Sequence, residues 1–339
     1  MTASAAMRAV RVRSFGFPPD AALEECETPE PGPGELLIAV RAAPVNYVDL
    51  LTMRGEYQFK PELPYTPGKG PAGVVVATGP GADGWAVGTR VLAMAEYGGY
   101  AEAVVVPQQS AYLLPDSLPF TAAGAMSLAF DTAWVSLRER ARLVPGESVL
   151  VLGANGAVGS AAVQLAVAMG ASPVLAGVSS PERYADLDHL GAGGMVDLSR
   201  PGLRDSVREQ VFALTDGRGV DVVVDPLGGD PFDGAVRALA WRGRLVVVGF
   251  ASGRIPTLAA NYLLLKNIEV SGIQISDYRK KTPELLEECY RDVFSLYVAG
   301  KVVAPAIVRY PLESWQAAVS DFASHRAKGR VLLVPDGED

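Results

Sequence analysis

The sequence predicts an α/β protein of two domains, a β-rich domain followed by a doubly wound parallel sheet. The chain has 339 residues, more than a single hydrophobic core usually organises. Residues 1–126 carry short apolar and β-branched runs between Gly and Pro, which is typical of strands and turns. From residue 147 onward, apolar strands alternate with helical segments, and this alternation favours a parallel sheet covered on both faces.

The β-rich part is expected to hold several short strands in succession. They are "MRAVRVRSF", "GELLIAVRAAPV", "GVVVATGPG", "GTRVLAMAEYGGYAEAVVVP" and "AYLLP". The Ala-rich stretch that follows, "PFTAAGAMSLAFDTAWVSLRERARL", predicts two helices. The sequence therefore changes from strands to helices around Pro119.

Six strands are expected in the second domain. They are "SVLVLG", "SPVLAGVS", "GGMVDL", "VDVVVDPLG", "GRLVVVGF" and "NIEVSGI". After residue 274 the pattern predicts an amphipathic helix, a strand, a second helix and a last strand. These segments are "TPELLEECYRDVFSLYVAGKV", "AIVRYPL", "SWQAAVSDFASHRAKG" and "RVLLVP".

Composition excludes several classes of protein. The formal net charge of -8 argues against a nucleic-acid partner. No apolar run is long enough for a membrane span, and the start lacks the apolar core of a signal peptide. The two cysteines make no disulfide framework. We therefore expect a cytoplasmic protein whose partner is a small molecule.

The most informative motif is "VLVLGANGAVGSAAVQLAVAMG", a buried strand that turns through glycines into a helix. Glycines at such a turn let a pyrophosphate approach the free N–H groups of the helix N-terminus. The alternative is a tight connection without a ligand, but the six-strand alternation favours a Rossmann dinucleotide site. The expected cofactor-binding residues of this turn are Gly153, Asn155, Gly156, Ala157, Val158 and Gly159.

The next strand end predicts which dinucleotide binds. An acidic residue there normally bonds the ribose hydroxyls of NAD. Here the strand ends in "AGVSSPER", with Ser179 at the acidic position and Arg183 after it. Without a carboxylate, a guanidinium is free to bind the 2′-phosphate, so we predict NADPH. Alternatively, Ser180 caps a helix that begins at Pro181, and Arg183 lies on a solvated face.

Taken together, these motifs carry a family likeness. The segments "PGPGELLIAVRAAPVNYVDLL", "GEYQFKPELPYTPGKGPAGVV", "GGYAEAVVVP", "DVVVDPLGG" and "NYLLLKNIEVSG" add to the glycine turn. Over nearly its whole length the chain resembles medium-chain dehydrogenases/reductases, specifically the zinc-free quinone oxidoreductase (zeta-crystallin-like) branch. The resemblance implies a GroES-like catalytic domain from residues 1–126 and 276–339 and a Rossmann domain from residues 127–275. It also implies an active site in the cleft between them and a homodimer paired through the last Rossmann strand.

The resemblance further implies additional cofactor contacts. Residues expected beside the nicotinamide are Thr132, Phe250, Asn261 and Leu263. Arg326 matches a basic residue near the adenosine phosphate, although a solvated helix end is an equally good interpretation. No metal is expected, because Asn46, Lys69, Gly70 and Leu128 stand at the ligand positions of the zinc-using relatives.

The catalytic residues are expected in "APVNYVDLLTMRGEYQ". Asn46 is a candidate for orienting a substrate carbonyl or the nicotinamide ribose, and Asp49 for ordering the segment. Tyr57 aligns with a tyrosine that resembles the proton donor of related enoyl reductases. Ordinary alternatives are a turn-capping Asn46 and a surface aromatic at Tyr57.

These expectations lead to one function and two rivals. The predicted function is NADPH-dependent, metal-free reduction of quinones or activated enones. The rivals are an enoyl-thioester reductase of the same fold and a non-catalytic NADPH-binding protein.

Overall fold

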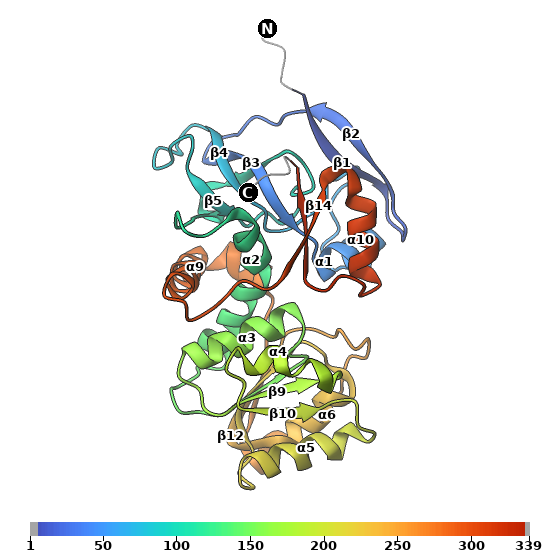
Figure 1. Ribbon diagram of the computed structural model, residues 1–339, viewed down its shortest axis with the longest axis vertical. Coiled ribbons are helices and arrows are strands. Elements are labelled where there is room, and N and C mark those ends of the chain that lie inside the picture. The colour runs from blue at the N-terminus through green and yellow to red at the C-terminus, as the bar shows by residue number, and fades with distance from the viewer. Residues whose placement is uncertain (1–5, 336–339) are drawn as a thin grey trace. The chain divides into compact units, whose positions relative to one another are not determined.

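The computed structural model describes residues 6–335, which fold into two compact units (Figure 1). The first unit combines Met1–Leu128 with Val303–Asp339, and the second unit is Ala129–Val302. The second unit is thus an insertion in the sequence of the first. Among the described residues, no helix is long and apolar enough to cross a membrane.

The C-terminal boundary differs from the prediction, because residues 276–302 belong to the second unit and not to the first. The reason is a buried ion pair. The Nη2 of Arg279, in α8 (Ile275–Lys281), donates to Asp131 Oδ2 over 2.7 Å. The hydroxyl of Tyr290, in α9 (Pro283–Val298), donates to the same oxygen over 2.9 Å. Both helices are therefore anchored to the second-unit part of α2 (Phe120–Val135), the helix that carries Asp131.

The first unit is built on a mixed sheet of seven strands. β3 (Glu35–Pro44) is its centre, since it pairs with β4, with β6 and, near its end, with β15. The order is β14-β15-β3-β4-β5-β7, with β6 added beside β3. The other strands are β4 (Ala72–Thr78), β5 (Arg90–Ala93), β6 (Ala103–Pro107), β7 (Ala111–Leu113), β14 (Ile307–Pro311) and β15 (Arg330–Val334).

Two further layers complete the first unit. β1 (Ala6–Ser14) and β2 (Asp20–Glu27) form an antiparallel pair. The helices α1 (Tyr47–Arg54) and α10 (Trp315–Ala323) lie side by side, as Figure 1 shows. Apolar residues of β1, β3 and α10 share one buried core. α1 starts shortly after β3 ends. The predicted catalytic residues Asn46 and Asp49 therefore lie at the start of α1, next to the end of the central strand.

The second unit contains the expected six-stranded parallel sheet. Its order is β10-β9-β8-β11-β12-β13, and every neighbouring pair is parallel. The strands are β8 (Val149–Leu152), β9 (Val174–Val178), β10 (Gly194–Asp197), β11 (Val220–Asp225), β12 (Leu239–Val247) and β13 (Glu269–Gly272). The first strand, β8, lies at the centre, so the strand order reverses there and creates the switch point where dinucleotides bind. The predicted doubly wound fold is confirmed.

Helices cover this sheet, and α5 and α6 run side by side in Figure 1. They are α3 (Ala157–Ala168), α4 (Ala185–Asp188), α5 (Leu203–Leu214), α6 (Gly229–Ala238) and α7 (Asn261–Lys266). The prediction of two helices over residues 119–143 is wrong for these residues. They form one helix, α2 (Phe120–Val135), which ends in a π-helical turn at Ser136–Arg140. No Gly or Pro interrupts the stretch between Ala125 and Leu143, so nothing breaks the helix there.

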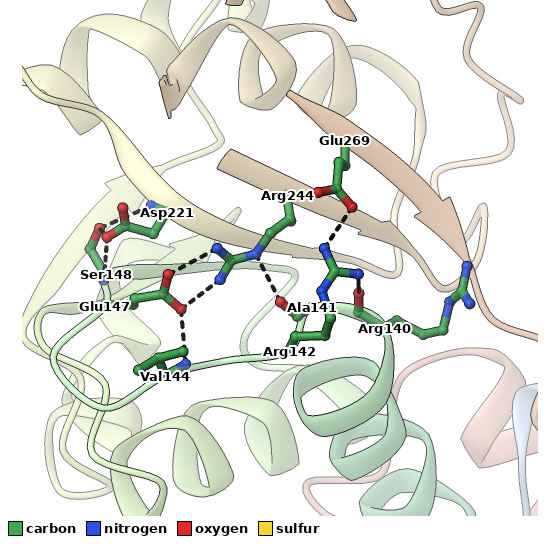
Figure 2. A network of polar contacts seen from close by, with 9 residues as sticks. All are labelled: Arg140, Ala141, Arg142, Val144, Glu147, Ser148, Asp221, Arg244 and Glu269. Carbon is green, nitrogen blue, oxygen red and sulfur yellow. Dashed lines mark hydrogen bonds and ion pairs between the residues drawn. The ribbon is translucent and has the colours of Figure 1, made fainter. Parts of the chain in front are cut away.

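A polar network fastens the amino ends of the parallel strands (Figure 2). Arg244 of β12 makes a two-pronged ion pair with Glu147 and donates from Nε to the Ala141 carbonyl over 2.8 Å. Ser148 and Asp221 bond each other through backbone and side chains. The loop that enters β8 is thereby held at this edge, which leaves the opposite, carboxyl edge for a ligand.

Candidate active site

The glycine turn at the end of β8 has the geometry of a dinucleotide cradle. Gly153 follows the strand with φ at 62°, a conformation that favours glycine. Gly156 is the N-cap of α3, with φ at -77° and ψ at 170°. A Cβ placed on Gly159 would lie 2.2 Å from the Gly153 carbonyl oxygen. Only a glycine at position 159 allows α3 to pack this closely on the strand end.

These residues fit a pyrophosphate. The first N–H groups of a helix have no partner inside the helix, and here they belong to Ala157, Val158 and Gly159. The first turn of α3 carries no acidic residue, so its positive end is not neutralised.

The end of β9 lies beside the turn and carries no carboxylate. Ser179 follows the strand and is exposed. The Arg183 side chain is 57% exposed, and its Nε lies 4.0 Å from Asp186 Oδ2. Asn155 donates from Nδ2 to the Arg183 carbonyl over 3.2 Å. Asn155 therefore ties the glycine turn to the segment that carries the candidate phosphate-binding arginine.

The remaining predicted cofactor residues lie in different surroundings. Thr132 is buried in α2 and donates from Oγ1 to Asp131 Oδ1 over 3.2 Å. Phe250 is exposed after β12, Asn261 is exposed at the start of α7, and Leu263 packs on the core of the second unit. Their contacts with nicotinamide stay predictions. Arg326 bonds Asp321 of α10 through Nε and Nη2, as the solvated-helix-end interpretation expects.

Sequence reasoning missed Asp225, a buried carboxyl at the end of β11. Its Oδ1 accepts N–H groups of Leu227 and Gly228, both over 2.9 Å. Burial raises the pKa of Asp225 to about 6. The loop it shapes brings Leu227 against Gly153, so Asp225 helps to build the floor of the glycine turn. An Asp followed by two glycines in "DPLGG" was the available signal.

In the first unit, Asn46 is the centre of a buried polar cluster. It is 4% exposed and forms the N-cap of α1. Its backbone N–H donates to Asp49 Oδ2 over 2.9 Å. Its Oδ1 accepts from Arg330 Nη2 over 2.7 Å, and its Nδ2 donates to the Lys69 carbonyl over 3.2 Å. The Asn46 amide is therefore locked in one orientation by two segments distant in sequence.

Asp49 orders this segment, since it accepts both the Asn46 N–H and the Tyr100 hydroxyl, the latter over 3.4 Å. Burial raises the pKa of Asp49 to about 6, although the charges of Lys69 and Arg330 act in the opposite direction. Burial also lowers the pKa of Arg330 to about 10. The cluster thus holds opposite charges away from water, where their fields are weakly screened.

The predicted proton donor, Tyr57, lies beside the ammonium group of Lys69, a residue at one of the ligand positions of the zinc-using relatives. Tyr57 is half-buried, and the Lys69 ammonium lies 5.5 Å from the centroid of its ring. The Lys69 side chain is only 5% exposed and forms an ion pair with Glu96. Asn46, Tyr57 and Lys69 therefore meet in one region of the first unit. Arg330, Tyr100 and Glu96 gave no signal in the sequence, because folding alone brings them to Asn46 and Lys69.

The glycine turn, the reversed strand order and the polar cluster define a class: a two-domain, dinucleotide-dependent dehydrogenase or reductase. Comparisons with known proteins sharpen this class. The family model described as "Alcohol dehydrogenase GroES-like domain" matches residues 32–116, and the model "Zinc-binding dehydrogenase" matches residues 157–291.

Individual relatives agree with these models. The quinone oxidoreductase-like protein 2 homolog of Nematostella vectensis is 36% identical over 304 residues, which cover 89% of this chain and 82% of the relative. The structure of the Pseudomonas syringae pv. Tomato DC3000 quinone oxidoreductase has a TM-score of 0.88 at 30% identity, covering 97% of this chain and 100% of that one. Mycobacterial Rv1454c, complexed with NADPH, has a TM-score of 0.86 at 29% identity, covering 97% and 100%. The chain belongs to the quinone oxidoreductase family of the medium-chain dehydrogenases/reductases, and it is an oxidoreductase.

Zinc appears in the description of one family model, but the residues of this chain do not fit it. The four positions considered as ligand sites hold an amide, an ammonium, a glycine and an aliphatic side chain: Asn46, Lys69, Gly70 and Leu128. Across residues 6–335, no group of three or more His, Cys, Asp or Glu side chains is arranged to hold a metal ion.

Proposed function

We propose that this enzyme uses NADPH to reduce quinones or activated α,β-unsaturated carbonyls by hydride transfer, without a metal. The observation that carries the proposal is the glycine turn of the second unit beside a strand end that bears Ser179 in place of a carboxylate. The names of the relatives, several of them quinone oxidoreductases, support the choice of substrate class.

The chain contributes binding, orientation and charge. The N–H groups at the start of α3 bind the pyrophosphate, and the Arg183 guanidinium binds the 2′-phosphate. In the first unit, the locked Asn46 amide keeps a fixed polar surface, because Arg330 and Lys69 prevent it from rotating. Asp49 accepts the backbone N–H of Asn46 and so holds Asn46 at the start of α1.

The test is the oxidation of NADPH, followed at its nicotinamide absorbance, with a panel of acceptors run side by side. The panel holds 1,4-benzoquinone, 9,10-phenanthrenequinone, a simple alkenal and crotonyl-CoA, each with and without EDTA. We expect quinone turnover that EDTA leaves unchanged. Binding of NADPH without turnover of any acceptor would contradict the proposal and favour a non-catalytic NADPH-binding protein.

The contact between Tyr57 and Lys69 favours a second candidate, enoyl-thioester reduction. A quinone needs no protein acid, since solvent can protonate the product, whereas an enolate gains from a positioned donor. Tyr57→Phe should therefore lower turnover of crotonyl-CoA or the alkenal by about tenfold or more while quinone turnover changes little. An equal loss on every acceptor would mean that Tyr57 binds substrate and does not donate a proton.

A further inference from the structure

The surroundings of Lys69 indicate a position built for its ammonium group. Lys69 lies between Gly68 and Gly70, whose φ values of 103° and 67° favour glycine. A Cβ on Gly70 would come within 3.0 Å of Ser127 Oγ and 3.1 Å of Met94 Sδ. The backbone is thus bent into a crowded site that delivers the lysine side chain to Glu96 and the Tyr57 ring.

Among the residues that the structure describes, the Lys69 ammonium does not use all of its hydrogen-bond donors. An ammonium group can donate three hydrogen bonds. Glu96 is the hydrogen-bond acceptor found for Lys69 Nζ within residues 6–335. The Lys69 side chain is 5% exposed, so water is mostly excluded from it. The electric field of the ammonium group is therefore weakly screened. A ligand oxygen that reached this group would meet a strong, nearly dry cation.

A purely structural ion pair is the competing explanation. Buried ion pairs contribute little net stability, because desolvating both charges offsets their attraction. The Glu96 side chain remains 27% exposed whereas the Lys69 side chain is 5% exposed, so the carboxylate keeps more contact with solvent than the ammonium does. A structural pair would not account for the contact of the ammonium with Tyr57 or for the hydrogen bond from Asn46 to the Lys69 carbonyl. Both contacts place Lys69 among the candidate substrate residues.

We propose that Lys69 is a catalytic residue that binds the substrate oxygen and stabilises the negative charge that develops on it. This inference rests on the proposed function and names the group that a metal-free reductase needs for its oxyanion. When a hydride equivalent from NADPH adds to the carbon acceptor, an electron pair moves to the conjugated carbonyl oxygen. Lys69 holds that oxyanion until one proton, from Tyr57 or from solvent, completes the product. The balance is one NADPH and one proton consumed for each substrate reduced.

Binding of a stable oxyanion tests this without requiring turnover. The probe is 2-hydroxy-1,4-naphthoquinone, which is ionised at neutral pH, and the neutral comparison is 1,4-naphthoquinone. Dissociation constants would be measured by calorimetry for the NADP⁺-loaded wild type, Lys69→Met, Lys69→Arg and Glu96→Gln. Lys328→Met removes a charge from an exposed lysine of the same unit and is the matched control.

Lys69→Met should weaken binding of the anion by about tenfold or more and leave the neutral quinone within about twofold of wild type. Lys69→Arg should retain most of the affinity. Glu96→Gln should bind the anion more tightly, since the ammonium loses its competing partner. A structural ion pair predicts the opposite for Glu96→Gln, so weaker binding by that variant overturns the proposal even if Lys69→Met fails to fold.

Two further outcomes separate this inference from the proposed function. Equal anion affinities for wild type, Lys69→Met and Lys328→Met would overturn the role of Lys69 whatever the enzyme reduces. If the acceptor panel gives no turnover but anion binding still depends on Lys69, the proposed substrates are wrong and the oxyanion site stands.

Discussion

Ser179 determines, in our proposal, which dinucleotide the enzyme prefers. It ends β9 with a hydroxyl where NAD sites carry a carboxylate, and Arg183 follows on an exposed turn. We expect NADPH to bind at least tenfold more tightly than NADH, since a bidentate guanidinium–phosphate contact is strong. Ser179→Asp should lower the affinity for NADPH by about tenfold through repulsion of the 2′-phosphate. Fluorescence titration with both cofactors measures this.

A matched control separates local from general charge effects. Ser295→Asp adds the same charge to an exposed position of α9 in the same unit and should leave both affinities unchanged. Equal affinity of the wild type for NADPH and NADH would show that the missing carboxylate does not set the preference.

Asp49 makes the stability of the first unit depend on pH. Burial raises its pKa to about 6 in the folded chain, above its ordinary value of 3.8. Between about pH 4 and pH 6 the unfolded chain loses this proton first, so the folded state loses stability as pH rises. The loss approaches about 3 kcal/mol, because one unit of pKa corresponds to about 1.4 kcal/mol. Asp49→Asn cannot titrate and lacks this loss.

The measurement is the free energy of unfolding of wild type and Asp49→Asn in urea at pH 4, 5, 6 and 7. The free energy of unfolding of the wild type should fall relative to that of Asp49→Asn as pH rises through this range. Asp225 titrates in the same direction in both proteins, so its effect cancels in the difference. A difference that stays constant with pH would contradict the raised pKa.

At the scale of an element, the start of α3 depends on its close approach to β8. A Cβ at position 159 would meet the Gly153 carbonyl oxygen, a backbone atom that cannot rotate away. Gly159→Ala should therefore destabilise the second unit by about 1–3 kcal/mol and abolish tight binding of NADPH. Gly84→Ala is the control, since a Cβ there meets no atom within 4 Å. Thermal unfolding and cofactor titration are the readouts, and normal binding by Gly159→Ala would refute the cradle.

At the scale of the whole molecule, we propose a homodimer formed at the edge of the second unit's sheet. β13 ends the strand order, and an open edge attracts a partner strand. The adjacent α7 exposes Leu264 and Leu265, at 78% and 73%, which is a large apolar surface for a helix of six residues.

Sedimentation equilibrium should give the mass of two chains. Leu265→Glu should shift it toward one chain, because a charge at an apolar interface is desolvated without a partner. Val87→Glu places the same charge at an equally exposed apolar residue of the first unit and should leave the dimer intact. A wild-type monomer at micromolar concentration would refute the proposal.

By itself, the sequence determined the class of the fold and the position of the glycine turn that we propose binds the dinucleotide. Alternation of apolar strands and helices, and glycines at 153, 156 and 159, are local patterns, and local patterns survive in a linear chain. The same reasoning predicted Asn46 and Asp49 as candidate site residues, and they lie three positions apart at the start of one helix.

Only the tertiary structure decided which distant groups meet. Arg330 donates a hydrogen bond to Asn46, although the two residues are 284 positions apart in the sequence. Lys69 forms an ion pair with Glu96 and contacts the Tyr57 ring, and both contacts depend on how the loops fold. The Asp131–Arg279 pair likewise placed residues 276–302 in the second unit. Side-chain pairing between segments far apart leaves no periodic trace in a sequence, because burial and the path of the chain create each pair. The charge environment of the candidate site is therefore a property of the fold.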